Sequence, residues 1–253
     1  MIKVDEHNWK TDALDNEVYK LLSHVSTATV STQLFKRGFR NIFMQGVLAL
    51  HKPVGMNLVG PAFTLRNIPA REDLDVIEAF QDPDHPQRRA IETAPPGSVL
   101  VQDCRGETAT ACCGSILLTR LKVRGVAGMV ADGPVRDSGT IESLGLPVFC
   151  AGRNAQTNLV RHHAIDMNLP IGCGGVPVYP GDILVGDIDG VVVIPRHLAQ
   201  EVAADSAEQE QLEEFISGRI CDGALLRGTY PANEDTKQEY RRWKSEQSGI
   251  GQR

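Results

Sequence analysis

The residues best suited to chemistry are an adjacent arginine and aspartate, Arg136 and Asp137, which follow the turn tripeptide Asp132-Gly133-Pro134. A guanidinium presents a planar fork that matches a carboxylate, and an aspartate offers hard oxygen ligands to a divalent cation. On a loop, both side chains can point into one pocket. The pair therefore suits an anionic substrate bound beside a metal ion. Two structural roles compete with this interpretation, since Asp137 could cap the helix that follows and Arg136 could form a surface ion pair.

The surrounding pattern predicts that this pair lies at the carboxyl end of a buried strand. Val126 to Val130 is a short β-branched run, and Ser138 to Leu144 has a helical pattern closed by Gly145. An earlier strand, Ser98 to Asp103, leads through a loop of small residues into a helix from Ser115 to Arg124. Two successive strand–loop–helix units favour parallel pairing, with both loops at one edge of the sheet. The first loop also suits an anion, because free amides and the helix dipole point the same way.

Patterns in the rest of the chain extend the α/β prediction. Further helices are expected at Asp15 to His24, Thr29 to Lys36 and His197 to Gly218, and further strands at Val59 to Leu65, Ile165 to Ile171, Val176 to Val178, Ile183 to Val185 and Val191 to Ile194. Pro69 to Gln87 is polar, with a helical patch and a proline-rich loop. The charged tail from Ala232 is expected to fray or to lie against a partner subunit. We expect N-terminal helices in residues 1–58, an α/β core in 59–218 and a charged C-terminal extension in 219–253.

Composition limits the classes of function. The 253 residues carry a net charge of −6 without a lysine–arginine cluster, which argues against nucleic acid as a partner. No apolar run is long enough to span a bilayer, and the N-terminus does not resemble a signal peptide, so we expect a cytoplasmic protein without a membrane partner. The six cysteines lack metal-ligand spacing, with Cys112 and Cys113 adjacent, and are expected to be reduced thiols. No dinucleotide-binding or Walker sequence is present.

Several stretches in combination resemble one known family. The string GSILLTRLKVRGVAGMVADGPVRD, followed by LGLPVF and then PGDILVGDIDGVVVIP, is similar to the RraA-like family. That family includes the 4-hydroxy-4-methyl-2-oxoglutarate and 4-carboxy-4-hydroxy-2-oxoadipate aldolases, and the resemblance covers roughly Val59 to Gly218. It implies an α/β swivelling domain of the β/β/α type, with stacked sheets flanked by helices. It also implies a homotrimer or homohexamer whose active sites lie between subunits.

The resemblance implies a chemistry as well. Such enzymes are similar to class II pyruvate aldolases, which use Mg²⁺ or Mn²⁺. They release pyruvate by retro-aldol cleavage of 4-hydroxy-2-oxo dicarboxylic acids, or decarboxylate oxaloacetate. By this resemblance Asp137 would be the direct metal ligand, and Arg136 would bind the carboxylate or keto oxygen of the 2-oxo acid substrate. The pyruvyl carboxylate would also bind the backbone amides of a loop formed by Ala111, Cys112, Cys113 and Gly114.

The chain departs from the family pattern at two positions. Where the aldolases have an acid upstream of the Arg-Asp pair, this chain has Ser115, and a serine cannot act as a carboxylate base. Thr140 stands where a second acid is frequent. Asp103, Arg105 and Glu107, on the loop before the helix, are candidates for the missing base. These departures leave open a lyase or hydratase that acts on another 2-oxo acid.

Two further expectations concern partners. The resemblance implies that a glutamate from a neighbouring subunit's C-terminal helix approaches the metal, and Glu213 is favoured over Glu210 and Glu214. The alternative to an enzyme is a non-catalytic regulator of the RraA type, which binds an RNase or another protein partner.

Two other groups of polar residues have mainly structural interpretations. His162 and His163 are expected on a surface turn rather than at a metal, because adjacent histidines point apart in regular structure. Asp182, Asp187 and Asp189 are expected to form turns, although their carboxylates could in principle hold a cation.

Overall fold

The computed structural model describes residues 11–51 and 57–250, so residues 1–10 and 52–56 of the predicted N-terminal region and residues 251–253 of the predicted C-terminal extension lie outside it. At its centre is an eight-stranded sheet in the order β1-β5-β4-β3-β2-β9-β10, with β6 also paired to β2. The strands are β1 (Leu48–His51), β2 (Leu58–Pro69), β3 (Val99–Asp103), β4 (Gly128–Ala131), β5 (Val148–Cys150), β6 (His162–Met167), β9 (Ile183–Gly186) and β10 (Val191–Ile194). A separate hairpin joins β7 (Ile171–Cys173) and β8 (Val176–Val178).

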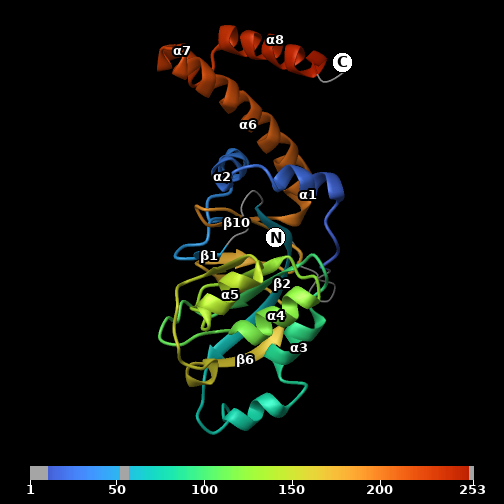
Figure 1. Ribbon diagram of the computed structural model, residues 1–253, viewed down its shortest axis with the longest axis vertical. Coiled ribbons are helices and arrows are strands. Elements are labelled where there is room, and N and C mark those ends of the chain that lie inside the picture. Colours follow the sequence, from blue (N-terminus) through green and yellow to red (C-terminus); the bar gives the residue numbers. More distant parts are fainter. Residues whose placement is uncertain (1–10, 52–56, 251–253) are drawn as a thin grey trace.

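The predicted strand–loop–helix units are confirmed. Strands β2, β3, β4 and β5 are parallel, and both connecting loops lie at their carboxyl ends. Helices α3 (Pro86–Thr93), α4 (Ser115–Val123) and α5 (Ser138–Leu144) cover one face of this parallel part (Figure 1). Leu100, Leu118, Met129 and Ile141 are fully buried between the helices and the sheet. Each such side chain contributes about 1.5–3 kcal/mol to folding through burial. Because they pack in one cluster, the parallel sheet and its helices share one hydrophobic core.

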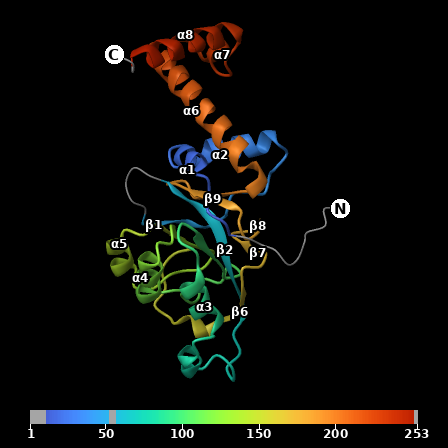
Figure 2. The ribbon, with the colours of Figure 1, turned by 90° about the vertical axis from the view of Figure 1, so that its right-hand side faces the viewer.

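The two halves of strand β2 pair with different strands of the sheet. Leu58–Pro61 pairs with β9, and the residues that follow pair with β3 and β6. Helices α1 (Asn16–Leu22), α2 (Thr27–Lys36) and α6 (Ala199–Cys221) pack in a second layer next to β9 and β10 (Figure 2). Asp187, in the turn between β9 and β10, accepts hydrogen bonds from the amide and the hydroxyl of Thr27 at 2.7 and 2.8 Å. Its Oδ1 also accepts a hydrogen bond from the amide of Asp189 at 2.9 Å, which confirms the expected turn.

The C-terminal region differs from the prediction of a frayed tail. Residues Leu226–Thr229 form the short helix α7, and Glu234–Ile250 form α8, which returns beside the end of α6 (Figure 1). The ring of Phe215 on α6 lies 5.9 Å from that of Tyr240 and 5.6 Å from that of Trp243 on α8, measured between centroids. Tyr240 and Trp243 are three residues apart, so they share one face of α8 and give this otherwise charged helix an apolar side that packs on α6. No helix in the described part of the chain is long and apolar enough to cross a bilayer.

The expected surface turn at the two histidines is wrong. His162 and His163 begin β6, which pairs antiparallel with the end of β2. Alternation along the strand buries His162, and burial lowers the pKa of its imidazole to about 4. His163 points to the other side, where its Nδ1 lies 2.8 Å from a carboxylate oxygen of Asp75. The histidines do point apart as expected, but as members of a strand.

Two elements near the parallel sheet were not predicted. Strand β1 pairs antiparallel with β5 at the edge of the sheet. Helix α3 follows a short 3₁₀ helix at Ile77–Gln81, and it begins at Pro86, which the sequence analysis placed in a loop. Proline is favoured at the first position of a helix, where its missing N–H costs nothing, so the same residue that ends a loop also starts α3.

Candidate functional site

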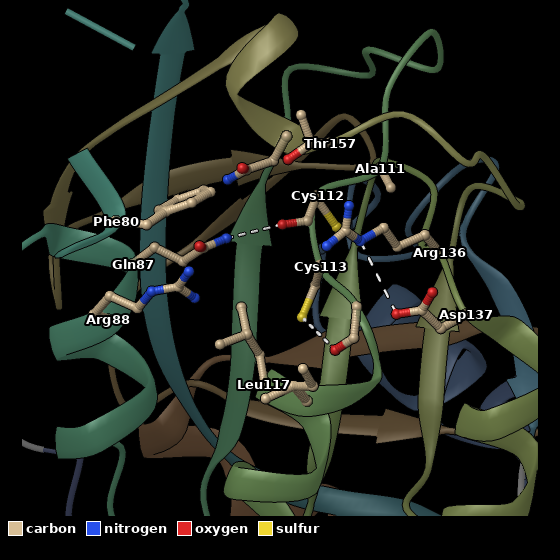
Figure 3. A pocket seen from close by; sticks show the side chains of 13 residues that line it. Phe80, Gln87, Arg88, Ala111, Cys112, Cys113, Leu117, Arg136, Asp137 and Thr157 are labelled. Carbon is tan, nitrogen blue, oxygen red and sulfur yellow. Dashed lines mark hydrogen bonds and ion pairs between the residues drawn. The ribbon is translucent and has the colours of Figure 1, made fainter. Parts of the chain in front are cut away.

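Arg136 and Asp137 lie together at a cavity of about 310 Å³ beside the carboxyl ends of the parallel strands. The cavity is bounded by α3, by the loop that precedes α4, and by the segment around Thr157 (Figure 3). Its volume lies at the lower end of the range of ligand pockets, which suits a small molecule. The lining residues are Phe80, Gln87, Arg88, Ala111, Cys112, Cys113, Gly114, Ile116, Leu117, Arg136, Asp137, Thr157 and Asn158.

Asp137 occupies the N-cap position of α5, but its side chain does not cap that helix. Its backbone is left-handed, with φ 60°, a conformation that costs most residues energy and that aspartate tolerates better than most. In this conformation Oδ2 accepts hydrogen bonds from the amide (3.1 Å) and the hydroxyl (3.2 Å) of Ser115, the first residue of α4. The carboxylate therefore stabilises the start of a neighbouring helix and stays at the cavity.

Arg136 is held through its backbone and leaves its guanidinium open to a ligand. The Arg136 amide donates to the carbonyl of Cys113 at 3.0 Å, which ties the two loops together. Its Nε lies 4.0 Å from Oδ2 of Asp137, and both side chains are 45% exposed. At that distance and exposure the pair is a weak ion pair. This ion pair, which the sequence suggested as a structural role for Arg136, therefore leaves the guanidinium able to bind a ligand.

Gly114 allows this close approach of the two loops. A Cβ atom built there would lie 2.8 Å from Oδ2 of Asp137 and 3.1 Å from Nε of Arg136. Those distances are shorter than van der Waals contact, so a larger residue would displace one or both functional side chains. Packing therefore requires a glycine at position 114 of the small-residue loop.

The loop from Ala111 to Gly114 is held in place on three sides. Its amides at Ala111 and Cys112 donate to the carbonyls of Gln156 (3.2 Å) and Pro134 (2.8 Å). The buried side chain of Gln87, on α3, donates to the carbonyl of Cys112 at 2.9 Å. This narrows the sequence expectation, because two of the four amides are already used inside the protein.

The amides of Cys113 and Gly114 remain for a ligand, since neither donates a backbone hydrogen bond in the described residues. They precede the first turn of α4, where the helix dipole favours an anion. Burial raises the pKa of the Cys113 thiol, so this side chain is a neutral wall of the cavity rather than a nucleophile.

The donor set fits a divalent cation held by a single carboxylate. Ser115 engages Oδ2 of Asp137, whereas Oδ1 has no hydrogen-bond partner among the residues described. Mg²⁺ is commonly bound through one or two carboxylates, with water and substrate oxygens as the other ligands. Within residues 11–51 and 57–250 there is no cluster of three or more His, Cys, Asp or Glu side chains that could hold a metal. A cation at Asp137 would therefore depend on water and on the substrate.

The candidates for the missing base lie elsewhere. Asp103 and Arg105 line a second cavity of about 690 Å³, and Glu107 accepts a hydrogen bond from the amide of Ala109. None of these three residues lines the cavity at Arg136. Of the residues that line that cavity, within the described structure, Asp137 is the only carboxylate.

The glutamates of α6 are also remote from Asp137 within one chain. Glu213 accepts a hydrogen bond from Gln209 at 2.7 Å and lines a different cavity, between α2 and α6. Glu210 accepts hydrogen bonds from the amide (2.9 Å) and the hydroxyl (2.7 Å) of Ser26, next to the start of α2. Glu210 therefore has a structural role, and an approach of Glu213 to a site requires a second copy of the chain.

One side of the cavity was not predicted from the sequence. Gln87 and Arg88 of α3 and Phe80 of the preceding 3₁₀ helix line it, and Figure 3 shows Arg88 and Arg136 reaching into the cavity from opposite sides. The sequence feature that could have predicted α3 is a proline, Pro86, followed by the apolar pair Ala90 and Ile91. Both are buried on the face of α3 that packs on the sheet.

Comparisons with known proteins agree with this fold. The profile of the family described as RraA-like, Aldolase/RraA, matches residues 27–193. A protein of Halalkalibacterium halodurans named "Putative 4-hydroxy-4-methyl-2-oxoglutarate aldolase" is 35% identical over 175 residues, which cover 67% of this chain and 77% of that protein.

Two solved structures have the same fold. The crystal structure of RraAS2 from Streptomyces coelicolor, described as an unusual member of the RNase ES inhibitor RraA family, is 35% identical with a TM-score of 0.70 and covers 81% of this chain and 97% of its own. An uncharacterized protein from Pseudomonas syringae pv. tomato is 27% identical with a TM-score of 0.76, covering 89% of this chain and 98% of its own.

Proposed function

Because the chain belongs to the RraA-like family, described as Aldolase/RraA, we propose that it is a divalent-metal-dependent carbon–carbon lyase acting on small 2-oxo acids. Its reaction is either the retro-aldol cleavage of a 4-hydroxy-2-oxo acid to pyruvate or the decarboxylation of oxaloacetate. The relative named as an aldolase supports the reaction class. The observation that carries the proposal is the placement of Arg136 and Asp137 at one small cavity, together with Cys113 and Gly114, whose amides donate no backbone hydrogen bond in the described residues.

In this proposal each group at the cavity has one task. The guanidinium of Arg136 and the amides of Cys113 and Gly114 bind the carboxylate and keto oxygen of the 2-oxo acid, since both are good donors to anionic oxygen. Asp137 holds Mg²⁺ or Mn²⁺ through its free oxygen, while Ser115 keeps the carboxylate oriented. The cation, when bound, supplies positive charge beside the 2-keto oxygen, where negative charge develops as the bond breaks.

The proton balance distinguishes the two candidate reactions. In a retro-aldol cleavage the 4-hydroxyl group loses a proton, the C3–C4 bond breaks, and C3 of the resulting enolate then gains a proton to give pyruvate. In the decarboxylation of oxaloacetate, carbon dioxide leaves C3 and only the final protonation is needed. Ser115 stands beside Asp137 in place of an acid, and the described lining of the cavity has one carboxylate, so the site supports decarboxylation more readily. For the retro-aldol reaction we propose that a neighbouring subunit supplies the base, with Glu213 as the candidate.

Pyruvate release, measured with a coupled assay, tests the proposal. The substrates are oxaloacetate and a panel of 4-hydroxy-2-oxo acids, with Mg²⁺ or with a chelator. Wild-type protein should release pyruvate with Mg²⁺ and lose the activity with the chelator. Asp137→Asn keeps an oxygen acceptor for Ser115 and tolerates the left-handed backbone, but it removes the charge. We expect it to reduce kcat/KM by about 10²-fold or more, in line with the loss of one preorganised electrostatic group.

Ser115→Asp provides the matching gain-of-function test. If the missing acid limits retro-aldol chemistry, this variant should cleave 4-hydroxy-2-oxo acids faster than wild type. An Asp137→Asn variant with activity within tenfold of wild type would contradict the metal role of Asp137. If the wild type releases no pyruvate from any substrate of the panel, the lyase proposal is contradicted. Turnover of a different 2-oxo acid would indicate another lyase or a hydratase.

A second candidate function rests on the similarity to RraAS2. A non-catalytic regulator would bind an endoribonuclease through its surface and inhibit RNA cleavage. The measurement is RNase activity on a structured RNA with added protein, together with co-purification of the two proteins. Inhibition that survives Asp137→Asn, combined with no turnover of 2-oxo acids, would favour the regulator over the lyase.

A further inference from the structure

The cavity has a second cationic side chain, Arg88, on the wall opposite Arg136. Arg88 lies on α3, next to the buried Gln87 that fixes this helix to the loop before α4. Its guanidinium carbon lies 4.2 Å from the centroid of the Phe80 ring, so the guanidinium packs over an aromatic ring in a cation–π contact. Figure 3 shows Arg88 reaching into the cavity from the side of α3. The contact with the ring uses none of the guanidinium N–H groups in a hydrogen bond, so they are available to a ligand.

Arg88 lacks an anionic partner. In the described residues it forms no ion pair and donates no hydrogen bond, and its contact is with Phe80. Burial lowers the pKa of the Arg88 guanidinium, and the positive charge of Arg136 lowers it further. An arginine remains protonated at neutral pH even so. A half-buried cation that faces another cation is costly unless a bound anion compensates it.

The charges around the cavity indicate how many negative charges a ligand should carry. Arg88 and Arg136 are cationic, Asp137 is anionic, and the other lining residues are neutral. With a divalent cation at Asp137 the lining would be strongly positive, which one carboxylate would not balance. A ligand with an anionic group at each end would balance it better, with one end at Arg136 and the other at Arg88.

We propose that Arg88 is a specificity-determining residue that binds the far carboxylate of a 2-oxo dicarboxylic acid. The 2-oxo-acid end of the same molecule lies at Arg136 and the amides of Cys113 and Gly114, so this inference rests on the proposed function. Arginine matches a carboxylate with two parallel N–H donors, which fixes the orientation of the bound molecule as well as its affinity. Phe80 acts as a positioning residue for Arg88.

Binding of two matched ligands tests the inference without depending on turnover. 2-Oxoglutarate and 2-oxopentanoate have the same five-carbon 2-oxo acid chain, and only 2-oxoglutarate has a second carboxylate. Neither has a 4-hydroxyl group to be cleaved by a retro-aldol step. Isothermal titration calorimetry with Mg²⁺ should show that wild-type protein binds 2-oxoglutarate about tenfold or more tightly than 2-oxopentanoate, the size expected of a charge-assisted pair.

Variants of α3 separate the far carboxylate from the rest of the ligand. Arg88→Gln should lose about tenfold or more in affinity for 2-oxoglutarate and keep its affinity for 2-oxopentanoate. Arg88→Lys keeps the charge without the fork and should fall between wild type and Arg88→Gln. Arg89→Gln is the matched control, because Arg89 is the exposed neighbour on the same helix and does not line the cavity. It should leave both affinities unchanged.

The outcomes separate this inference from the proposed function. Arg136→Gln should weaken both ligands, since it acts on the end that they share. If wild type binds both ligands, Arg136→Gln weakens both, and Arg88→Gln weakens neither or both equally, the inference is overturned and the proposed function stands. If wild type binds neither ligand, or if Arg136→Gln has no effect, the proposed function fails and the inference fails with it.

Discussion

At the scale of single residues, the site depends on how closely two loops approach each other. Gly114 has no side chain at the point where the loop before α4 passes Asp137 and Arg136. Asp137 in turn adopts a left-handed backbone, which brings its carboxylate to Ser115 rather than to its own helix. Strain of this kind concentrates at functional sites, where the surrounding contacts keep it in place. The two features are linked, because the left-handed turn puts the carboxylate where a Cβ of residue 114 would lie.

Gly114→Ala is therefore expected to damage function more than stability. The added methyl group must push aside the carboxylate of Asp137 or the guanidinium of Arg136, and a displacement of about 1 Å at a reacting centre can cost about 10²-fold in rate. We expect a fall of that order in kcat/KM for pyruvate release. Both side chains are partly exposed and can move, so the thermal midpoint should change little.

The matched control is Gly139→Ala. Gly139 lies on α5, close to Asp137 in sequence, but a Cβ atom there would have no neighbour within 4 Å. This variant should keep wild-type activity, and alanine should slightly stabilise the helix. Equal activities of Gly114→Ala and Gly139→Ala would show that the close approach at Gly114 has no functional role.

At the scale of secondary structure, strand β6 connects pH to stability. His162 is 1% exposed. Its pKa is lowered to about 4, mainly by burial and to a smaller extent by the positive charge of Arg105. Arg105 can only donate to Nδ1, 3.3 Å away, so Nε2 carries the imidazole proton and has no partner in the described structure. The unfolded chain, with an ordinary histidine pKa of 6.5, takes up a proton that the folded chain excludes. The stabilising contribution is therefore complete above pH 6.5 and is lost as the pH falls towards 4.

The free energy of unfolding should fall by about 1.4 kcal/mol per pH unit in this window because of His162. Urea unfolding at neutral pH and near pH ~5 measures the slope. His162→Gln, which does not titrate, should have a shallower slope than wild type. His24→Gln removes an exposed histidine and should retain the wild-type slope. A wild-type slope in His162→Gln would mean that other groups cause the acid sensitivity.

The same scale shows what the sequence could predict and what it could not. The strands β3 and β4, helix α5 and the turn between β9 and β10 have strong local signals, in the form of β-branched runs and Gly, Pro or Asp punctuation. Helix α3 is short and polar and begins at a proline, so its local signal is that of a loop. Its helical state depends on Ala90 and Ile91 packing against the sheet, a contact that only the tertiary structure supplies.

The candidate site divides in the same way. Arg136, Asp137 and Ser115 follow strand ends that the sequence predicts, and the parallel pairing brings them to one edge. Arg88 contributes from α3, and nothing in its own segment indicates which cavity it faces. Residues that approach a site from a separate element are determined by packing, and periodicity in one segment cannot reveal them.

At the scale of the whole molecule, α6 extends away from α3, α4 and α5 (Figure 1), and Glu213 on α6 lines a different cavity from that of Asp137. We propose that the protein assembles as a homotrimer or homohexamer in which α6 of one subunit lies near Asp137 of another. Light scattering coupled to size-exclusion chromatography should show a trimer or a hexamer. A monomer that releases pyruvate at wild-type rate would contradict this arrangement.

Mixed oligomers test whether Glu213 acts across subunits. Glu213→Gln and Asp137→Asn should each lower retro-aldol activity when alone. Unfolded and refolded together, the two variants should regain part of that activity, because some sites then combine an intact Asp137 with an intact Glu213 from another chain. Glu214→Gln, mixed in the same way, is the control for a neighbouring glutamate. If the mixture has only the average activity of the two variants, Glu213 does not serve a neighbour's site.

The long strand β2 has a consequence for the entire chain. Its first residues bond to β9, beneath the layer of α1, α2 and α6, and its last residues bond to β3 and β6, beside the cavity. The two layers therefore share one backbone, and neither can melt without removing bonding partners from the other. A substitution far out in the helical layer would thus lower the fraction of molecules with an intact cavity, although it touches no residue there.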